Sequence, residues 1–289
     1  MEEIIAGGAA VYSTVWTTVE EGGTRLICKI CGNNSRFVFT QTVLMKYEVA
    51  YYQCTSCEFI QTEDPYWLEE AYQASLNIED TGIVTRNVLC AKRTSAILFA
   101  FFNHRGHFLD YGGGTGLFVR MMRDLGYDFY WNDPLTANIF ARGFEFDSVN
   151  IRNFEAVTSF ECLEHFVEPH EEIKKMLSLA PSIIVSTELF QKGTPSPDTW
   201  NYYFFSHGQH IALYSLRSLQ IIAEQYHLHL LTNNRSFHIF TPEKHSSILF
   251  QALLKASAVG LPAFISLLKE SKTHSDSQAM ESRRNAKIL

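Results

Sequence analysis

The strongest chemical pattern in the sequence is a run of glycines, Gly112-Gly113-Gly114-Thr115-Gly116, shortly after Asp110. The apolar residues before this run predict a buried strand over 108–111, and the residues after it predict a helix over 117–125. Glycines at such a junction let the backbone turn sharply and approach a ligand, and the following helix offers free N–H groups. A dinucleotide fingerprint would need a further glycine at position 117, where the chain has Leu117, so the pattern disfavours NAD.

Four of the six cysteines form two Cys-x-x-Cys pairs: Cys28 with Cys31, and Cys54 with Cys57. Each pair places two thiolates on one tight turn, and two such turns complete a tetrahedral zinc site. The segments 36–40 and 47–52 between the pairs are aromatic and β-branched and predict the strands of a ribbon. Reduced structural cysteines and a redox-active pair are the alternatives. Structural zinc is favoured because all four ligand positions are filled, and Cys90 and Cys162 are expected as small buried side chains.

Histidine and glutamate side chains near expected strand ends are candidate general bases. Glu164 and His165 follow an expected strand over 156–160, whereas His207 and His210 lie in a later loop beside an aromatic run over 200–205. His210 is the preferred base, because a pocket wall and a proton acceptor would converge there. His165 either acts directly or caps the next helix, and the aromatic residues are alternatively part of the core.

The segment from Asp110 to Gly116 resembles motif I of the class I S-adenosylmethionine-dependent methyltransferases. Asp133 ends the next expected strand, and in that family the acid at this position accepts hydrogen bonds from both ribose hydroxyls of the cofactor. Alone, Asp133 would be explained as a turn-forming residue before Pro134. Residues 154–166 resemble the fourth-strand motif of the same family. The resemblance implies S-adenosylmethionine as cofactor, with these candidate binding residues: Asp110, Gly112, Gly114, Gly116, Asp133, Phe160 and Glu161.

The longer segment from residue 28 to about residue 240 is similar to sugar C-methyltransferases and to methyltransferases of polysaccharide gene clusters, in which a four-cysteine ribbon precedes the methyltransferase domain. Residues 61–67 and 207–210 take part in this likeness. It implies a small polar acceptor, such as a nucleotide-linked sugar or a glycan precursor. Glu161 and Glu188 are then candidates to bind the cofactor's amino group or a sugar hydroxyl. A cofactor-binding scaffold whose ribbon engages a partner protein is the alternative function.

These residues must be positioned by the surrounding elements. Short apolar runs alternate with helical stretches, which predicts an α/β, Rossmann-like, mostly parallel sheet with helices on both faces, plus a small N-terminal zinc-ribbon module. Loops at the carboxyl ends of such strands bind ligands. The aromatic residues Tyr66, Trp67 and Tyr72 are expected in a lid over the cofactor.

The expected units are an N-terminal extension (1–24), the zinc-ribbon module (25–62), a helical linker or lid (63–104), the methyltransferase domain (105–241), and a helical C-terminal extension with a disordered tail (242–289). The expected helices cover about 87–103, 170–179 and 216–226, with another beginning at Asp64-Pro65; further strands cover 129–132, 183–186 and 228–231, and a strand over 11–19 is an option.

Composition excludes several classes of protein. The chain has 289 residues, 46% of them hydrophobic, and a net charge of -7, which argues against disorder and against nucleic-acid binding. The first residues lack the basic flank and apolar run of a signal peptide, so a cytoplasmic location is expected. Residues 248–268 are largely apolar, yet Gln251, Lys255 and Pro262 argue against a membrane span and favour a packed or interfacial helix pair.

Overall fold

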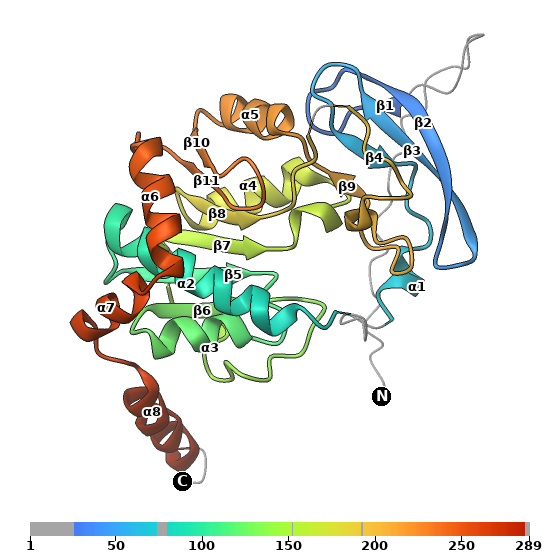
Figure 1. Ribbon diagram of the computed structural model, residues 1–289. Helices are drawn as coiled ribbons and strands as arrows, with labels where there is room; N and C mark the ends of the chain where they lie inside the picture. Colours follow the sequence, from blue (N-terminus) through green and yellow to red (C-terminus); the bar gives the residue numbers. More distant parts are fainter. Residues whose placement is uncertain (1–25, 74–79, 152, 192, 287–289) are drawn as a thin grey trace, which may run out of the picture.

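The computed structural model describes residues 26–73, 80–151, 153–191 and 193–286 (Figure 1). The expected N-terminal extension and the optional strand over 11–19 lie outside the described residues. The α-helices are α1 (Leu68–Ala71), α2 (Ile83–Phe101), α3 (Leu117–Asp124), α4 (Pro169–Leu179), α5 (Leu216–Gln225), α6 (Ser247–Ala258), α7 (Leu261–Leu268) and α8 (Thr273–Ala286). Short 3-10 helices are η1 (Phe146–Ser148), η2 (Leu163–His165) and η3 (Asn201–Tyr203).

The strands form two sheets. The N-terminal sheet has the order β1-β2-β3-β4-β9, and the central sheet has the order β10-β11-β8-β7-β5-β6. Their bounds are β1 (Leu26–Ile27), β2 (Asn34–Val43), β3 (Tyr47–Cys54), β4 (Ile60–Thr62), β5 (His107–Tyr111), β6 (Asp128–Asn132), β7 (Ala156–Phe160), β8 (Ile183–Ser186), β9 (Ala212–Leu213), β10 (His229–Thr232) and β11 (His238–Thr241). Strands β6, β5, β7 and β8 are parallel, and β11 runs antiparallel to both β8 and β10. The expected mostly parallel sheet is therefore confirmed, with an antiparallel strand that was not anticipated.

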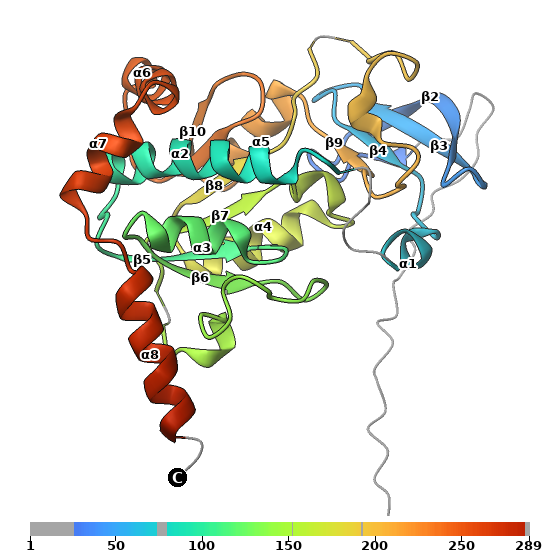
Figure 2. The ribbon, with the colours of Figure 1, turned by 60° about the horizontal axis from the view of Figure 1, so that its bottom comes forward.

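Alternating side chains of the central strands pack on opposite faces of the sheet. Phe108 and Ile184 belong to one buried cluster, which α2, α3 and α6 cover. Leu109 and Ile183 belong to the other cluster, to which α4 and α5 contribute. Both faces are thus shielded by helices, as expected for parallel strands (Figure 2).

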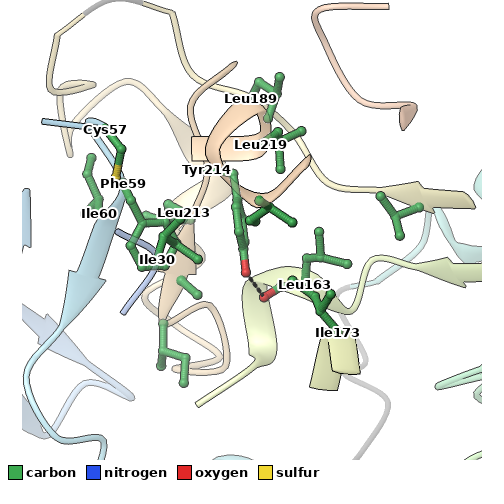
Figure 3. Close-up of a cluster of buried hydrophobic side chains, with 14 of the residues drawn as sticks. Ile30, Cys57, Phe59, Ile60, Leu163, Ile173, Leu189, Leu213, Tyr214 and Leu219 are labelled. Atoms are coloured by element: carbon green, nitrogen blue, oxygen red, sulfur yellow. Dashed lines mark hydrogen bonds between the residues drawn. The ribbon is translucent and has the colours of Figure 1, made fainter. Parts of the chain in front are cut away.

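The N-terminal sheet shares a hydrophobic core with the central domain. Ile30, Phe59 and Ile60 lie next to Leu213 and Tyr214 in one buried cluster (Figure 3). The two-residue strand β9 completes the N-terminal sheet by pairing with β4, although it lies about 150 residues further along the chain. The four-cysteine module is therefore joined to the rest of the protein by both backbone hydrogen bonds and apolar contacts.

The segment after this sheet differs from the expectation. A helix beginning at Asp64-Pro65 is wrong, because residues 64–67 form a turn and α1 begins only at Leu68. The indole of Trp67 is buried and its Nε1 donates to the carbonyl of Gly208 at 2.7 Å, so tertiary contact determines this turn.

The expected disordered tail is also wrong for the described residues, because 273–286 form α8. Asp276 lies against Arg123 of α3, with Nε···Oδ2 and Nη2···Oδ1 distances of 2.8 and 2.7 Å. Arg123 is buried and also donates to Asp128 and to the carbonyl of Phe129. A polar helix is thus held to the domain by a bidentate ion pair, to which Arg120 adds a second contact with Asp276 at 2.9 Å.

We predict that Arg123→Leu lowers the free energy of unfolding by about 3 kcal/mol, because Asp128 and Asp276 lose the buried cation that they share. Urea denaturation gives the measurement. The control is Arg217→Leu, which removes a solvent-exposed pair with Glu224 and is expected to change stability little. Equal effects of the two substitutions would contradict the prediction.

Candidate functional site

The glycine loop joins the carboxyl end of β5 to α3. Gly112, Gly114 and Gly116 have φ angles of 71°, 52° and 81°, in the left-handed region that favours glycine. A Cβ on Gly112 would lie 2.6 Å from Sγ of Cys162, whereas a Cβ on Gly114 would meet open space. The loop therefore needs glycine at Gly112 for packing, and it leaves room for a ligand beside Gly114.

Asp133 closes the loop from the neighbouring strand β6. Its Oδ2 accepts a hydrogen bond from the N–H of Gly114 at 2.8 Å, and its Oδ1 accepts from the N–H groups of Leu135 and Thr136. The side chain therefore forms the turn that its position before proline suggests. It also places a carboxylate at the mouth of the glycine loop, where the methyltransferase resemblance puts a ribose.

Asp110 lies beneath this loop on β5. Its side chain is buried and accepts a hydrogen bond of 2.6 Å from the hydroxyl of Thr158 on β7. Desolvation raises the pKa of Asp110 to about 7, and the negative charge of Asp133 adds to the shift. Among the described residues no ion pair involves Asp110, so its buried carboxyl favours a positively charged ligand.

Two further carboxyl groups follow β7. Glu161 has a φ of 52°, and its Oε1 accepts a hydrogen bond of 2.5 Å from Ser186. Glu164 in η2 is fully buried, and its Oε1 accepts a hydrogen bond of 2.6 Å from the hydroxyl of Tyr202. Desolvation, together with the nearby Glu161, raises the pKa of Glu164 to about 8, and desolvation also raises the pKa of Glu161. Within the described part of the chain, Oε2 of Glu164 has no hydrogen-bond partner.

Glu164, His165 and His210 come together in the structure. One ligand atom from each lies within 4.8 Å of the other two, and the two imidazole rings meet edge to face at 4.9 Å. Desolvation lowers the pKa of His165 to about 4 and the pKa of His210 well below its ordinary value. Both rings are therefore neutral near pH 7, and three of the four candidate bases predicted from the sequence form one cluster.

Hydrogen bonds orient both histidines. Nδ1 of His210 lies 2.6 Å from the carbonyl oxygen of Tyr202, and Nδ1 of His165 lies 3.0 Å from the hydroxyl of Tyr72. Because a carbonyl only accepts, the neutral His210 ring carries its proton on Nδ1 and presents a lone pair at Nε2. Tyr72 also lies near Asp133 and Glu164, whose charges add to desolvation in raising the pKa of this phenol.

The position of His210 depends on the N-terminal module. The indole of Trp67 donates a hydrogen bond to the carbonyl of Gly208. The side-chain amide of Gln209 donates to the carbonyl of Ala71. The N–H of Ile211 then donates to the carbonyl of Glu164 at 2.9 Å, while its carbonyl accepts from Thr62. The loop that carries His210 is thus held between β4 and η2.

The remaining candidate residues, His207, Phe160 and Glu188, lie outside this cluster and contact other side chains. The imidazole of His207 stacks on Phe204 at 5.1 Å. Phe160 packs between Phe118 and Phe237, at ring distances of 4.9 and 5.9 Å. Glu188 accepts a hydrogen bond of 3.0 Å from the indole of Trp200.

A cavity of about 560 Å³ opens after β8, and its lining does not include the histidine cluster. Its lining includes Glu188, Trp200, Asn234 and Arg235. Trp200 contacts Tyr202 at a ring distance of 5.5 Å, and Tyr202 contacts His210 at 4.7 Å. Trp200 on the cavity wall is therefore linked to His210 through the ring of Tyr202.

The sequence analysis missed the contributions of Thr158, Cys162 and the Tyr202 hydroxyl. Thr158 could have been noticed as a polar residue inside an otherwise apolar strand. Cys162 was expected only as a small buried side chain, but its Sγ packs against Gly112. Nothing local distinguishes Tyr202 from its aromatic neighbours, because its partner Glu164 is 38 residues away.

The four paired cysteines converge on one point. Their sulfur atoms lie within 4.8 Å of one another, with Sγ···Sγ distances of 3.5 Å for Cys28 and Cys57 and 3.3 Å for Cys31 and Cys54. Both turns have the same backbone pattern, in which the first cysteine is followed four residues later by a left-handed residue, Gly32 or Glu58. Four thiolates at these separations fit one tetrahedral metal ion.

A protein-family model described as "Methyltransferase domain" matches residues 85–233, which is more than half of the chain. The chain therefore belongs to this methyltransferase family, and the enzyme class expected from the sequence is confirmed. A comparison with curated proteins gives no match.

Solved structures with a similar fold include other methyltransferases. CalO1, a methyltransferase in calicheamicin biosynthesis with bound S-adenosylhomocysteine, is 11% identical over 62% of this chain and 60% of its own, with a TM-score of 0.42. The 1,6-didemethyltoxoflavin-N1-methyltransferase of Burkholderia thailandensis is 12% identical over 70% and 97%, with a TM-score of 0.45. A possible histamine N-methyltransferase from Thermotoga maritima is 11% identical over 60% and 97%, with a TM-score of 0.42. The chain thus spans about 60% of the length of CalO1.

We predict that stability falls as the pH rises from about 6 to about 8.5, because a carboxyl whose pKa is raised by folding binds more protons in the folded state. For Glu164, the contribution of the protonated carboxyl to stability is complete below the ordinary pKa of glutamate. It is lost as the pH rises through about 8, the pKa of Glu164 in the folded protein. Burial lowers the pKa values of His165 and His210, so the contribution of their neutral forms to stability is lost only in acid.

The measurement is the urea midpoint at both ends of this pH range, for the wild type and for Glu164→Gln. The neutral amide retains an acceptor for Tyr202, so its midpoint is expected to fall less with pH. Glu224→Gln, on an exposed helix face, serves as the control and is expected to follow the wild type. A wild-type slope in Glu164→Gln would contradict the assigned role.

Proposed function

We propose that the protein transfers a methyl group from S-adenosylmethionine to a small polar acceptor, such as a nucleotide-linked sugar or a related glycan precursor. Membership of the methyltransferase family supports methyl transfer. The glycine loop supports the cofactor, and the cavity after β8 supports the acceptor.

The observation that carries the proposal is the concentration of carboxyl groups around the glycine loop. Asp110, Glu161 and Glu164 all have raised pKa values, and Asp133 lies at the loop itself. Desolvated carboxyls are unfavourable unless a cation compensates them. S-adenosylmethionine carries a sulfonium and an amino group, so its charge matches this environment, whereas a pyrophosphate would be repelled.

Asp133 is proposed to bind the ribose hydroxyls, because its two oxygens lie at the mouth of the loop. Glu161, at the end of β7, is proposed to bind the cofactor's amino group. Phe160 is proposed to line the same site on the side of α3, where it contacts Phe118. The sulfonium provides the leaving group, so the protein has to align the acceptor and remove its proton.

His210 is proposed as the base. Its Nδ1 donates to Tyr202, so Nε2 is available to accept a proton from the acceptor. Glu164, protonated near neutral pH, lies next to it and can donate a hydrogen bond through the oxygen that lacks a partner. His165, held by Tyr72, is proposed to help orient the acceptor, and Tyr72 to cover the reacting methyl group.

The cavity supports a polar, ring-shaped acceptor. Glu188, Asn234 and Arg235 supply acceptors and donors on its wall, while Trp200 supplies a flat apolar surface. Polar groups that fix orientation, combined with an aromatic face, suit a sugar. Arg235 additionally suits an anionic group such as a phosphate.

The four-cysteine cluster is proposed to hold structural zinc. All four positions of the tetrahedron are supplied by the protein, which leaves no site for substrate. The hydroxyl of Ser215 donates to the carbonyl of Cys57 at 2.7 Å, so the cluster is linked directly to the segment that follows His210. The metal is thus proposed to stabilise the loop of the catalytic base.

Cofactor binding is the first test. Asp110, whose pKa is about 7, becomes negatively charged between about pH 6 and pH 7.5. Over this range, calorimetry is expected to show a larger gain in affinity for S-adenosylmethionine than for S-adenosylhomocysteine, because only the former carries the sulfonium charge. Asp133→Asn is expected to weaken both ligands about tenfold or more. Asp147→Asn, at an exposed acid, is the control. Absence of binding by either ligand would refute the proposed function.

The acceptor is tested by incubating the protein with S-adenosylmethionine and a panel of nucleotide-linked sugars, followed by mass spectrometry. A product heavier by one methylene is expected with the wild type and is expected to be lost in His210→Asn. Cofactor binding without turnover of any sugar would instead favour the scaffold function.

For the metal, protein purified without added zinc is expected to contain about one equivalent per chain. Cys54→Ser is expected to lower both the metal content and the unfolding midpoint, because metal binding contributes to folding. Cys90→Ser, at a buried cysteine outside the cluster, is the control and is expected to retain the metal. Normal metal content in Cys54→Ser would contradict the assignment.

A further inference from the structure

Helices α6 and α7 leave an unusual amount of apolar side chain exposed. We define the α6–α7 surface as Ile248, Val259, Phe264, Leu267 and Leu268, all of them exposed, with values of 81% for Leu267 and 85% for Val259. The opposite face of the pair is anchored, since Phe250, Leu254 and Ile265 are buried. The pair lies at the edge of the domain (Figure 1), and the exposures place one apolar face inward and another outward.

This outward face carries a lysine and no acid between the flanking residues Glu243 and Glu270, in a chain that is acidic overall. Between Lys244 and Lys269 the sequence contains Lys255 but no aspartate or glutamate, although the whole chain has a net charge of -7. Lys255 is exposed and follows Ile248 by seven residues and precedes Val259 by four, so these three side chains share one helix face. The positive charge is thus interleaved with the apolar residues.

More cations gather where α7 ends. Nζ of Lys269 donates to the carbonyl of His104 at 2.9 Å. Desolvation and the neighbouring charges of Lys272 and Arg105 lower the pKa of Lys269. Arg105 is itself exposed, and Glu270 is the first acid after α7. The three cations therefore lie beside the exposed end of the helix pair.

The chemistry of this surface matches a lipid better than a protein. Its members are aliphatic residues and one phenylalanine, whereas the centres of protein interfaces are enriched in tryptophan, tyrosine and arginine. Within the described residues no single helix is long and apolar enough to cross a bilayer, and α6 and α7 are bent by 89° relative to each other. An apolar face flanked by lysines is the pattern of a segment that lies in a membrane surface.

We propose that the α6–α7 surface binds the protein peripherally to an anionic phospholipid membrane. The apolar side chains enter the boundary between head groups and acyl chains, and Lys244, Lys255 and Arg105 face the anionic head groups. The proposal does not depend on the proposed methyl transfer, because it concerns a different face of the molecule.

The fold also determines how the enzyme would face the membrane. The carbonyl of Glu270 lies close to Gly126, just before β6, and Lys269 contacts His104, just before β5. The end of α7 is therefore at the amino ends of these strands, whereas the glycine loop is at their carboxyl ends. The active site would face away from the bilayer, so the membrane recruits the protein and is not itself the acceptor.

The test is co-sedimentation of the full chain with vesicles of phosphatidylcholine, with and without phosphatidylglycerol. Binding is expected only to the anionic vesicles and is expected to fall with added salt. The variant Phe264→Ser/Leu267→Ser is expected to bind about tenfold or more weakly, because less apolar surface enters the membrane. Both side chains are exposed, so the fold is expected to persist, which circular dichroism checks.

Met45→Ser, at a side chain 91% exposed on the N-terminal sheet, is the matched control and is expected to bind as the wild type does. Absence of binding to anionic vesicles would overturn the proposal. So would a wild-type dimer in light scattering that Phe264→Ser/Leu267→Ser converts to a monomer without any vesicle binding, because a second copy would then cover this surface. Neither result would affect the cofactor-binding test.

Discussion

The pairing of β9 with β4 is the interaction on which the candidate active site depends. Only two residues of β9 take part, yet they fasten residues 207–215 between the cysteine module and η2. Ile211 connects both sides, since its carbonyl accepts from Thr62 and its N–H donates to Glu164. The hydroxyl of Tyr214 then donates to the carbonyl of Leu163 within the shared core (Figure 3). Through these bonds, His210 is brought to Glu164 and His165.

A second constraint is electrostatic. The parallel strands β5, β6 and β7 end at one edge, and each carries or is followed by an acid near that edge: Asp110, Asp133 and Glu161. Desolvation of Asp110 and Glu161 opposes folding, and hydrogen bonds from Thr158 and Ser186 offset only part of the cost. This arrangement favours the binding of a cationic ligand. Desolvation also explains why His165 and His210 are neutral, since burial disfavours the charged imidazolium form.

Several elements could be predicted because their signals are local. Strands β7 and β8 were predicted with the observed bounds, since short apolar runs bordered by turns hardly fit another element. The tail was misjudged, because the polar residues of α8 give no local sign that Asp276 would meet Arg123, 153 residues earlier. Strand β9 was missed for a similar reason, since two residues form a strand only when a partner lies beside them. The turn at 64–67 was predicted as a helix start because the contact of Trp67 with Gly208 cannot be seen locally.

The sequence by itself determined the glycine loop, the acid after β6 and the two cysteine pairs. In each of these, the chemistry lies in residues close together along the chain, so spacing alone specifies the geometry. The tertiary structure alone decided which of the candidate bases come together and how the cysteine module reaches the site. Those arrangements depend on contacts between segments 40 to about 150 residues apart, and packing and desolvation of the folded chain select them from many combinations that the sequence allows.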